Sequence, residues 1–476
     1  MNRIWIIVSL APLSGLPAPS APPCQRLERA GTQIQGEVKI CPGRYRLPDP
    51  TEKGVIIIAA SRSRLDLTGV TIESGDSTSS RFVGIGIVSR GVDRVEIVGG
   101  TVRGYRYGIR LEGGRGHLVS GTDVSGSRNQ HLLSTPDSYN EQDWLDIFHP
   151  DTFDTYGSGL LLKWTDGATI IGITARNGQN GIGLFGARGS YLAENDVSSN
   201  TGWGIHLWQA SHNTIVRNVA SNNVRCESAS YSHGCDSAGL LLRERSDSNF
   251  IADNDLTHSG DGFFLSGHRP LVQPSIGNLV IRNNATGAYH NAFESTFSAW
   301  NVFLENRADS SAYGFWLGYS TGNTVRGNTM VGTRIAGIAI EHGSDNEIAA
   351  NVIIGGRMGI RLFAPQAGQE ASTNYRVHDN TIARVTVGMS MEKTTHSKIR
   401  GNLFDAVGDG LTVDEAGSDA ELSGNIFLRA DRMFIRAPHL DAGGNFWGTA
   451  NETATGSRVE GQVNLKPWRP ASAAGY

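Results

Sequence analysis

The strongest constraint on the fold is an internal repeat. The pattern Gly-(Ile/Leu/Phe)-x-(Leu/Ile) recurs down most of the 476 residues, and its uninterrupted intervals are 22 or 23 residues. A period of this length is typical of a solenoid, in which each repeat packs only against its neighbours. The copies, including two close variants at the end, begin at Gly108, Gly159, Gly181, Gly204, Gly239, Gly262, Gly314, Gly337, Gly359, Gly388 and Gly410.

A second pattern, Asn-x-(Ile/Val/Phe)-x-x-Asn, runs in step with the first, for example from Asn213 to Asn218. Inside each glycine motif the apolar residues alternate with a period of two, which predicts short strands rather than helical turns. Three such strands per coil can stack on the coils above and below at about 4.8 Å. An Asn that recurs at one corner can bond to its counterpart in the next coil. A leucine-rich-repeat solenoid is the rival fold, but the helical half of its repeat is absent.

From about residue 50 to the C-terminus the sequence resembles the right-handed parallel β-helix family, so we expect an all-β, single-stranded solenoid. Cys41-Pro42-Gly43-Arg44-Tyr45 resembles the entry coil of secreted members, and the segments 443–448 and 463–468 resemble the closing segment of bacterial members. The coils are similar to those of pectin-lyase-like and mannuronan-epimerase-like proteins. The Asn ladder and closing segment also resemble periplasmic β-helix proteins that assist copper-site assembly in nitrous oxide reductase.

The first residues predict export. A short cationic start, an apolar run from Ile4 to Leu16 and small residues behind it are typical of a secretory signal over residues 1–20. The run is shorter than the ~20 residues of a spanning helix, and no later window is apolar for that length, so no membrane span is expected. A periplasmic or secreted location follows. In an exported chain, two local cysteine couples favour two disulfides, Cys24 with Cys41 and Cys226 with Cys235.

The repeat sets the expected domain limits. An N-terminal cap covers 21–50, the β-helix covers 51–440, and a C-terminal cap covers 441–476. Two insertions interrupt the repeat, near 130–157 and 219–236. The first carries Trp144, Phe148 and several carboxylates, and it can be either a lid over a groove or a packing flap over an apolar strand face.

The outward side of the motif strand carries an unusual stripe of side chains. With each glycine counted as zero, positions +2 and +4 point outward, and Ala292 takes the glycine slot in one coil. Aromatic planes interleaved with charges suit sugar rings, whereas a protein or lid interface is the alternative. The stripe and its edges contribute His206, Trp208, Arg243, Asp261, Phe264, Glu294, Trp316, Tyr319, Glu341 and Arg361.

These residues predict a carbohydrate-active enzyme on a polysaccharide or oligosaccharide, with a glycoside hydrolase slightly favoured. Glu294, Glu341 and Asp261 are the acid/base candidates. Two pairs are possible, Glu294 with Glu341 and Asp261 with Glu294. Strand geometry places the Cβ atoms of either pair about 10–12 Å apart, nearer to the spacing of inverting than of retaining glycosidases. The remaining stripe residues would bind substrate: His206, Arg243 and Arg361 by charge or polarity, and Trp208, Phe264, Trp316 and Tyr319 by stacking.

The alternatives are a uronate lyase or epimerase and a non-catalytic glycan-binding or copper-accessory protein. The chain lacks an Asp-Pro-His motif, and its 6 Met and paired cysteines do not favour copper. No cofactor or metal is expected. With 42 basic against 46 acidic side chains, the balanced charge does not favour nucleic-acid binding.

Overall fold

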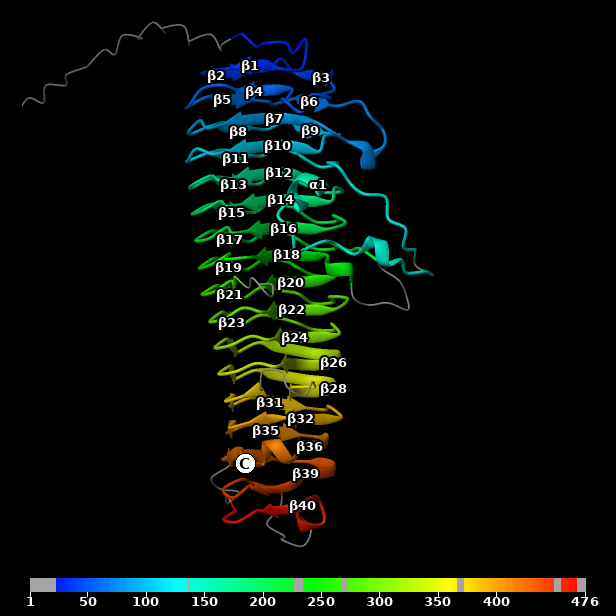
Figure 1. Ribbon diagram of the computed structural model, residues 1–476, viewed down its shortest axis with the longest axis vertical. Helices are drawn as coiled ribbons and strands as arrows, with labels where there is room; N and C mark the ends of the chain where they lie inside the picture. The colour runs from blue at the N-terminus through cyan, green and yellow to red at the C-terminus, as the bar shows by residue number, and fades with distance from the viewer. Residues whose placement is uncertain are drawn as a thin grey trace, which may run out of the picture.

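The protein folds into a long column of stacked coils (Figure 1). The computed structural model describes residues 23–135, 137–226, 234–267, 273–365, 372–448 and 455–468, so the predicted signal lies outside them. Nearly every described strand pairs in parallel with the equivalent strand of the next coil. The right-handed parallel β-helix predicted from the repeat is confirmed. Regular pairing begins inside the predicted N-terminal cap, where β1 (Thr32–Ile34) pairs with β4 (Ile56–Ile58).

The glycine motifs form one continuous sheet, the anchor sheet. Its strands are β7 (Ile85–Arg90), β10 (Tyr107–Glu112), β12 (Ser158–Lys163), β14 (Asn180–Phe185), β16 (Trp203–Trp208), β18 (Ala238–Arg243), β20 (Asp261–Ser266), β22 (Asn291–Thr296) and β24 (Tyr313–Gly318), and it continues into β26 (Thr329–Glu341), β28 (Val352–Phe363), β32 (Val387–Glu392), β36 (Val407–Val413), β39 (Ala430–Asp441) and β40 (Val459–Asn464). Phe263 pairs with Phe293, which confirms that Ala292 takes the glycine slot. The glycines are needed because the next coil is close: a Cβ on Gly204 would lie 2.6 Å from the carbonyl oxygen of Gly239.

A second sheet of three-residue strands forms another side of each coil. It contains β2 (Glu37–Lys39), β5 (Arg64–Asp66), β8 (Glu96–Val98), β11 (Leu118–Ser120), β13 (Thr169–Ile171), β15 (Tyr191–Ala193), β17 (Thr214–Val216), β19 (Phe250–Ala252), β21 (Leu279–Ile281), β23 (Val302–Leu304), β25 (Thr324–Arg326), β27 (Glu347–Ala349), β30 (Arg376–His378), β34 (Lys398–Arg400) and β37 (Glu421–Ser423). The middle residue of each strand faces the core, and the first and third face outward, as the burial patterns show.

Buried asparagines line both ends of this second sheet. Asn218 is representative: its backbone N–H and its Nδ2 both donate to Asn254 Oδ1 at 2.9 Å, and Nδ2 also donates to the carbonyl of Leu192. The same contacts repeat from coil to coil, for example from Asn254 to Asn283. The predicted Asn ladder is therefore confirmed, and it satisfies buried backbone groups that the corners would otherwise leave unpaired.

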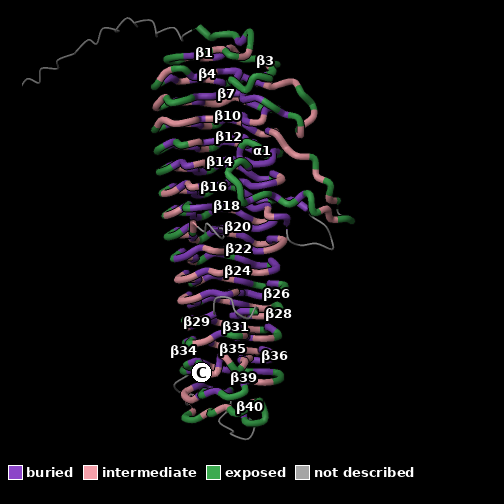
Figure 2. The backbone as a smooth tube through the Cα atoms, viewed as in Figure 1, coloured by how far each residue is buried: buried purple, intermediate pink, exposed green. Residues whose placement is uncertain are grey.

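The described part of the first insertion, residues 129–135 and 137–157, crosses the outside of the anchor sheet (Figures 1 and 2). We call it the flap; it contains one turn of 3-10 helix, η2 (Glu141–Asp143), and the short helix α1 (Thr152–Tyr156). Both predicted disulfides, Cys24–Cys41 and Cys226–Cys235, are present. At the C-terminal end Trp447 is fully buried and stacks on Phe427, as expected for a cap. The described residues form no helix that is long and apolar enough to span a membrane.

Candidate functional site

The flap covers the anchor sheet from β7 to β20. Leu145, Ile147 and Tyr156 of the flap form one buried cluster with outward side chains of β16, β18 and β20. Phe153 of α1 forms a second cluster with side chains of β7, β10, β12 and β16. The described part of this insertion is therefore a packing flap over an apolar strand face, the second of the two interpretations that the sequence left open.

Four predicted groove residues lie under this flap. Trp208 is 5% exposed and Phe264 is 4% exposed, because flap side chains pack on them. His206 is 1% exposed and lies between Phe153 and Trp203, with ring centroids 4.3 and 4.4 Å away. Neither nitrogen of His206 has a hydrogen-bond partner among the described residues, and burial lowers its pKa well below the usual value. In this conformation none of the three offers a surface to a glycan.

Arg243 is the fourth predicted groove residue under the flap, and it binds the flap to the anchor sheet. Its side chain is fully buried; Nε donates to the carbonyl of Ile147 in the flap at 2.8 Å, and Nη1 donates to the carbonyl of Gly267 at 2.8 Å. The guanidinium group also lies 5.3 Å from the ring centroid of Phe148. Burial lowers its pKa to about 10, so it stays charged at neutral pH. Its charge is used inside the protein and does not neutralise a substrate carboxylate in this conformation.

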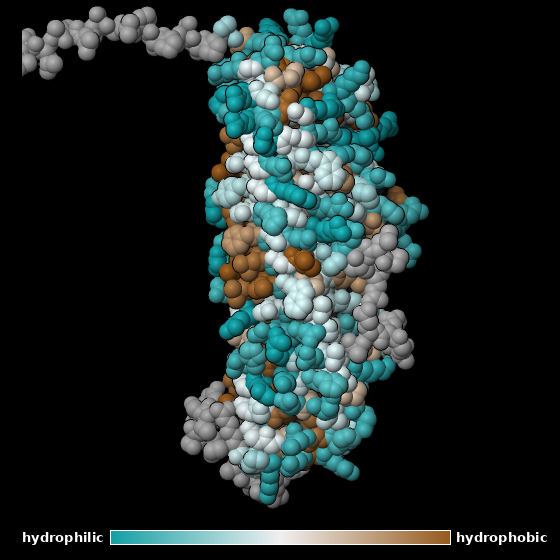
Figure 3. All heavy atoms as spheres, turned by 60° about the vertical axis from the view of Figure 1, so that its left-hand side comes forward, coloured by the Kyte–Doolittle hydropathy of each residue, from teal (hydrophilic) through white to brown (hydrophobic). Residues whose placement is uncertain are grey.

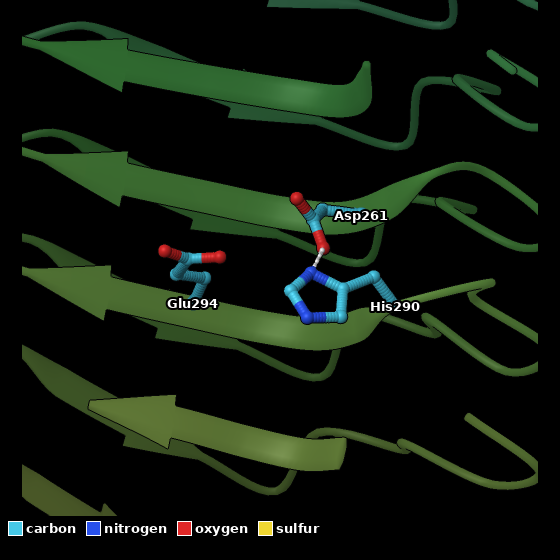
Figure 4. Close-up of side chains that lie close together, drawn as sticks. All are labelled: Asp261, His290 and Glu294. Carbon is cyan, nitrogen blue, oxygen red and sulfur yellow. Dashed lines mark ion pairs between the residues drawn. The ribbon is translucent and has the colours of Figure 1, made fainter. Parts of the chain in front are cut away.

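An acidic cluster lies on the anchor sheet at the edge of the area that the flap covers, on β20 and β22. Asp261, at the start of β20, His290, just before β22, and Glu294, within β22, point toward one another (Figure 4). One ligand atom from each residue lies within 4.8 Å of the other two. Asp261 Oδ1 is 3.5 Å from His290 Nδ1, and it accepts a 2.8 Å hydrogen bond from the backbone N–H of Asn291. The Asn291 amide donates to Glu294 Oε2 at 2.5 Å.

Burial raises the pKa values of the carboxyl groups in and beside this cluster. Asp261 is 1% exposed, and burial raises its pKa to about 8. Burial, followed by the nearby Asp261 charge, raises the pKa of Glu294 well above its usual value. Asp236, which precedes β18, has its pKa raised to about 7 by burial and by the charge of Asp261. Burial lowers the pKa of His290, against the opposing effects of Glu294 and Asp236. Near neutral pH the carboxyl groups therefore retain at least part of their protons.

An aromatic surface continues below the cluster, beyond the described flap. Glu294 pairs in register with Phe264 on one side and Trp316 on the other. Trp316 is partly exposed and contacts Tyr313 and Phe363, with ring centroids 4.9 and 5.9 Å away. Arg361 lies 4.0 Å from the ring centroid of Phe363 and pairs with Glu392 at 3.2 Å. Trp316 and Arg361 thus lie on the predicted stripe, next to the acidic cluster.

The last two predicted residues lie apart from the cluster. Tyr319 is at the corner after β24 and stacks between Phe297 and His342, at 5.0 and 4.6 Å. Glu341 pairs in register with Gly318 and Phe363, and its carboxylate lies 3.4 Å from His342. The structure brings Asp261 and Glu294 together and leaves Glu341 outside. The side chains of Asp261 and Glu294 turn toward each other, which brings one oxygen of each within 4.8 Å.

Sequence reasoning did not place His290 in the site, whereas Asn291 shares with Asp261 the slot before the motif, which the sequence indicated as the edge of the groove. His290 precedes β22 and Asn291 is its first residue, at a corner where strand alternation does not fix the direction of a side chain. Three polar residues around one slot indicate a shared cluster.

The cluster also meets the distance requirement of a metal site. One imidazole and two carboxylates are donors that suit a divalent ion. They do not suit Cu(I), which prefers thiolate and thioether donors. All four cysteines are in disulfides, and Met330, Met389 and Met391 are buried in the core.

The comparisons with known proteins agree with the fold. A family model for the right-handed β-helix region matches residues 158–330, and one for the periplasmic copper-binding protein NosD matches residues 257–461. A search of curated protein sequences found no match. Both matches fall within the described right-handed parallel β-helix, and together they extend over residues 158–461.

Several solved structures share this fold at low identity. The A-module of the mannuronan C-5 epimerase AlgE6 from Azotobacter vinelandii is 14% identical, with a TM-score of 0.40 over 82% of this chain and 90% of that one. A mutant of the periplasmic alginate epimerase AlgG is 14% identical, with a TM-score of 0.45 over 80% and 84%. The family 28 exopolygalacturonase of Yersinia enterocolitica is 11% identical, with a TM-score of 0.40 over 82% and 72%. These similarities concern the fold alone.

Proposed function

We propose that the protein is a glycoside hydrolase that cleaves a polysaccharide or oligosaccharide at the Asp261–Glu294 pair. The observation that carries the proposal is that one carboxyl oxygen of Asp261 and one of Glu294 lie within 4.8 Å of each other at the edge of the flap. Glycosidases use two carboxyl groups, about 5–5.5 Å apart in retaining and about 6.5–9.5 Å apart in inverting enzymes. The spacing supports a retaining enzyme, unlike the inverting spacing that the sequence favoured.

The division of roles follows from exposure. Glu294 is the more open of the two, so its protonated carboxyl group is placed to give a proton to the leaving glycosidic oxygen. The partner group, Asp261, stabilises the positive charge that develops on the sugar ring only in its deprotonated form, which gains population as the pH approaches its raised pKa of about 8. Trp316 provides a ring face for stacking on the adjacent strand. Arg361, already held by Glu392, would contact sugar hydroxyl groups at the same surface.

Elimination or epimerisation of a uronate requires a free cation beside a proton-abstracting base. Two of the predicted polar binding residues, His206 and Arg243, are buried under the flap, and Arg243 is bound to backbone carbonyls. This arrangement supports hydrolysis over elimination. The periplasmic or secreted location is part of the same proposal, supported by the two disulfides.

The test is product analysis on a panel of neutral and acidic polysaccharides. We expect new reducing ends without unsaturated products, retained anomeric configuration, and a loss of at least about a hundredfold in Glu294→Gln, the range typical of a general acid. Glu305→Gln, an exposed glutamate on another side of the coil, is the matched control and should keep full activity. Unsaturated products would reassign the chemistry to elimination. Activity that disappears with a chelator and returns with Zn²⁺ would contradict proton transfer by the pair alone.

A further inference from the structure

The outward face of the second sheet carries a long apolar stripe. Over the seven consecutive strands from β11 to β23, none of the 14 outward positions is charged and 11 are apolar. The apolar ones are Leu118, Ile171, Tyr191, Ala193, Val216, Phe250, Ala252, Leu279, Ile281, Val302 and Leu304. Figure 3 shows hydrophobic residues gathered at mid-length, with hydrophilic residues above and below.

Charged residues begin abruptly at both ends of the stripe. Toward the N-terminus the outward positions of β2, β5 and β8 include Glu37, Arg64 and Glu96. Toward the C-terminus those of β25, β27 and β30 include Arg326, Glu347 and Arg376. Along one edge the corner residues form an ion-paired rim, with Arg217 bound to Glu194 and Arg282 bound to Asp253. An apolar centre inside a charged rim is the arrangement of a protein interface.

Some apolar side chains of the stripe remain exposed to solvent. Ala193, Val216 and Ala252 are buried by their neighbours, whereas Ile171, Tyr191 and Ile281 are only partly buried around them. Phe250 remains 38% exposed. Water contact with these side chains costs free energy in proportion to the exposed apolar area, which a flat partner would remove. Because the face is flat and uniform for seven strands, the partner must also be flat and elongated.

We propose that this face binds a second copy of the chain, face to face and antiparallel, about a two-fold axis that runs along β17. The sequence of charges selects this arrangement. With β17 opposite itself, β11 meets β23, β5 meets β27 and β2 meets β30. Arg64 then faces Glu347, and Glu37 faces Arg376, so opposite charges meet at both ends. A parallel arrangement places each charged strand opposite its own copy: Glu37 would face Lys39 and Arg64 would face Asp66 at one end, but Glu347 and Arg376 at the other end would face Ala349 and His378 and meet no opposite charge.

The size of the contact predicts a weak dimer. The 13 strands from β2 to β30 at about 4.8 Å spacing and a width of about 10 Å give roughly 600 Å² per copy. About 1,200 Å² in total is the lower limit of specific interfaces. A dimer that dissociates on dilution is therefore expected, with both acidic clusters outside the contact because they lie on the anchor sheet.

The first test is sedimentation of the full-length protein at concentrations up to about 200 µM. We expect a concentration-dependent dimer, weakened at least tenfold in Phe250→Glu. The control Trp164→Glu changes a more exposed aromatic residue at a corner beyond the anchor strand and should leave the association unchanged. A protein that stays monomeric throughout the range overturns the proposal.

The second test fixes the geometry and does not depend on the affinity. Because all native cysteines are paired, Thr214→Cys introduces a single thiol on the proposed axis, next to its own copy. We expect a disulfide-linked dimer under mild oxidation. Thr324→Cys on β25 lies four strands from the axis, so its two copies are about 38 Å apart and should not cross-link. Equal cross-linking of both variants, or of neither, contradicts the antiparallel dimer.

Discussion

At the level of single residues, the charge state of Asp261 makes stability depend on pH. Its pKa is raised to about 8 in the fold, against about 3.9 in an unfolded chain. Between these values the folded protein binds more protons than the unfolded one, so the free energy of unfolding falls as the pH rises, by up to about 1.4 kcal/mol per pH unit. We expect Asp261→Asn to flatten this fall, measured by denaturant unfolding between pH 5 and pH 8.

The control for that prediction is Asp253→Asn. Asp253 is ion-paired to Arg282 on the surface, which lowers its pKa, so it contributes stability that is present at high pH and lost on acidification. Removing it should leave the fall between pH 5 and pH 8 unchanged. An equal fall in the wild type and in Asp261→Asn would show that Asp261 is ionised throughout the range.

His206 makes the free energy of unfolding depend on pH in the opposite direction. Its pKa is lowered by burial, so the unfolded chain takes up a proton near pH 6.5 while the folded protein does not, and stability falls as the pH drops below that value. Both ring nitrogens are also buried without a partner among the described residues, at a cost of about 1–3 kcal/mol. His206→Leu should therefore raise the free energy of unfolding at pH 7, and raise it more at pH 5. A destabilised variant at both pH values would indicate that the packing on Phe153 outweighs the unpaired nitrogens.

At the level of elements, the flap is a separate layer bonded to the coils at several points, including Tyr107 to the carbonyl of Phe153 and Arg225 to the carbonyl of Asp143. Arg243 bonds it to the anchor sheet through the carbonyl of Ile147, and charged hydrogen bonds of this kind contribute about 1.5–3 kcal/mol each. We expect Arg243→Met to increase hydrogen exchange and proteolysis within 130–157 while the coils keep their protection. Arg217→Met, which removes an exposed ion pair, is the control and should change neither. Cooperative loss of protection in the coils themselves would contradict a separate flap.

The same elements show how far sequence reasoning reaches. The coil could be predicted because its constraints repeat: each motif glycine meets the carbonyl of the next coil, and each ladder Asn meets the next Asn. The position of the flap could not, because a single insertion has no periodicity to reveal which face it covers. His206, Arg243 and Glu294 all occupy outward positions, and only the path of the flap separates those under it from those beside it.

The site shows the same limit. Asp261 and Glu294 were identified as acid/base candidates, and their closeness depends on a corner whose backbone the repeat does not specify. Asn291 connects them by donating its backbone N–H to Asp261 and its amide to Glu294. Glu341 has the same residue type in an equally outward position, yet it lies beside His342 instead. The pattern therefore identified the residue types on this face, and the corner geometry decides which of them meet.

At the level of the whole molecule, a solenoid couples each coil only to its neighbours. A substitution in one coil should therefore destabilise only that coil and those next to it. The Cys24–Cys41 disulfide closes a 17-residue separation at the N-terminal end, worth about 3 kcal/mol by chain entropy. Replacing both cysteines with serine should speed amide exchange in β1 and β4 and leave β20 to β24 unchanged. Asn283→Ala is the contrasting variant, because it removes the bond from Asn283 Nδ2 to Asn306 and the two bonds that Asn283 Oδ1 accepts from Asn254, in the middle of the column, and should raise exchange there. Uniform acceleration along all coils in the serine variant would show that the column unfolds as one cooperative unit.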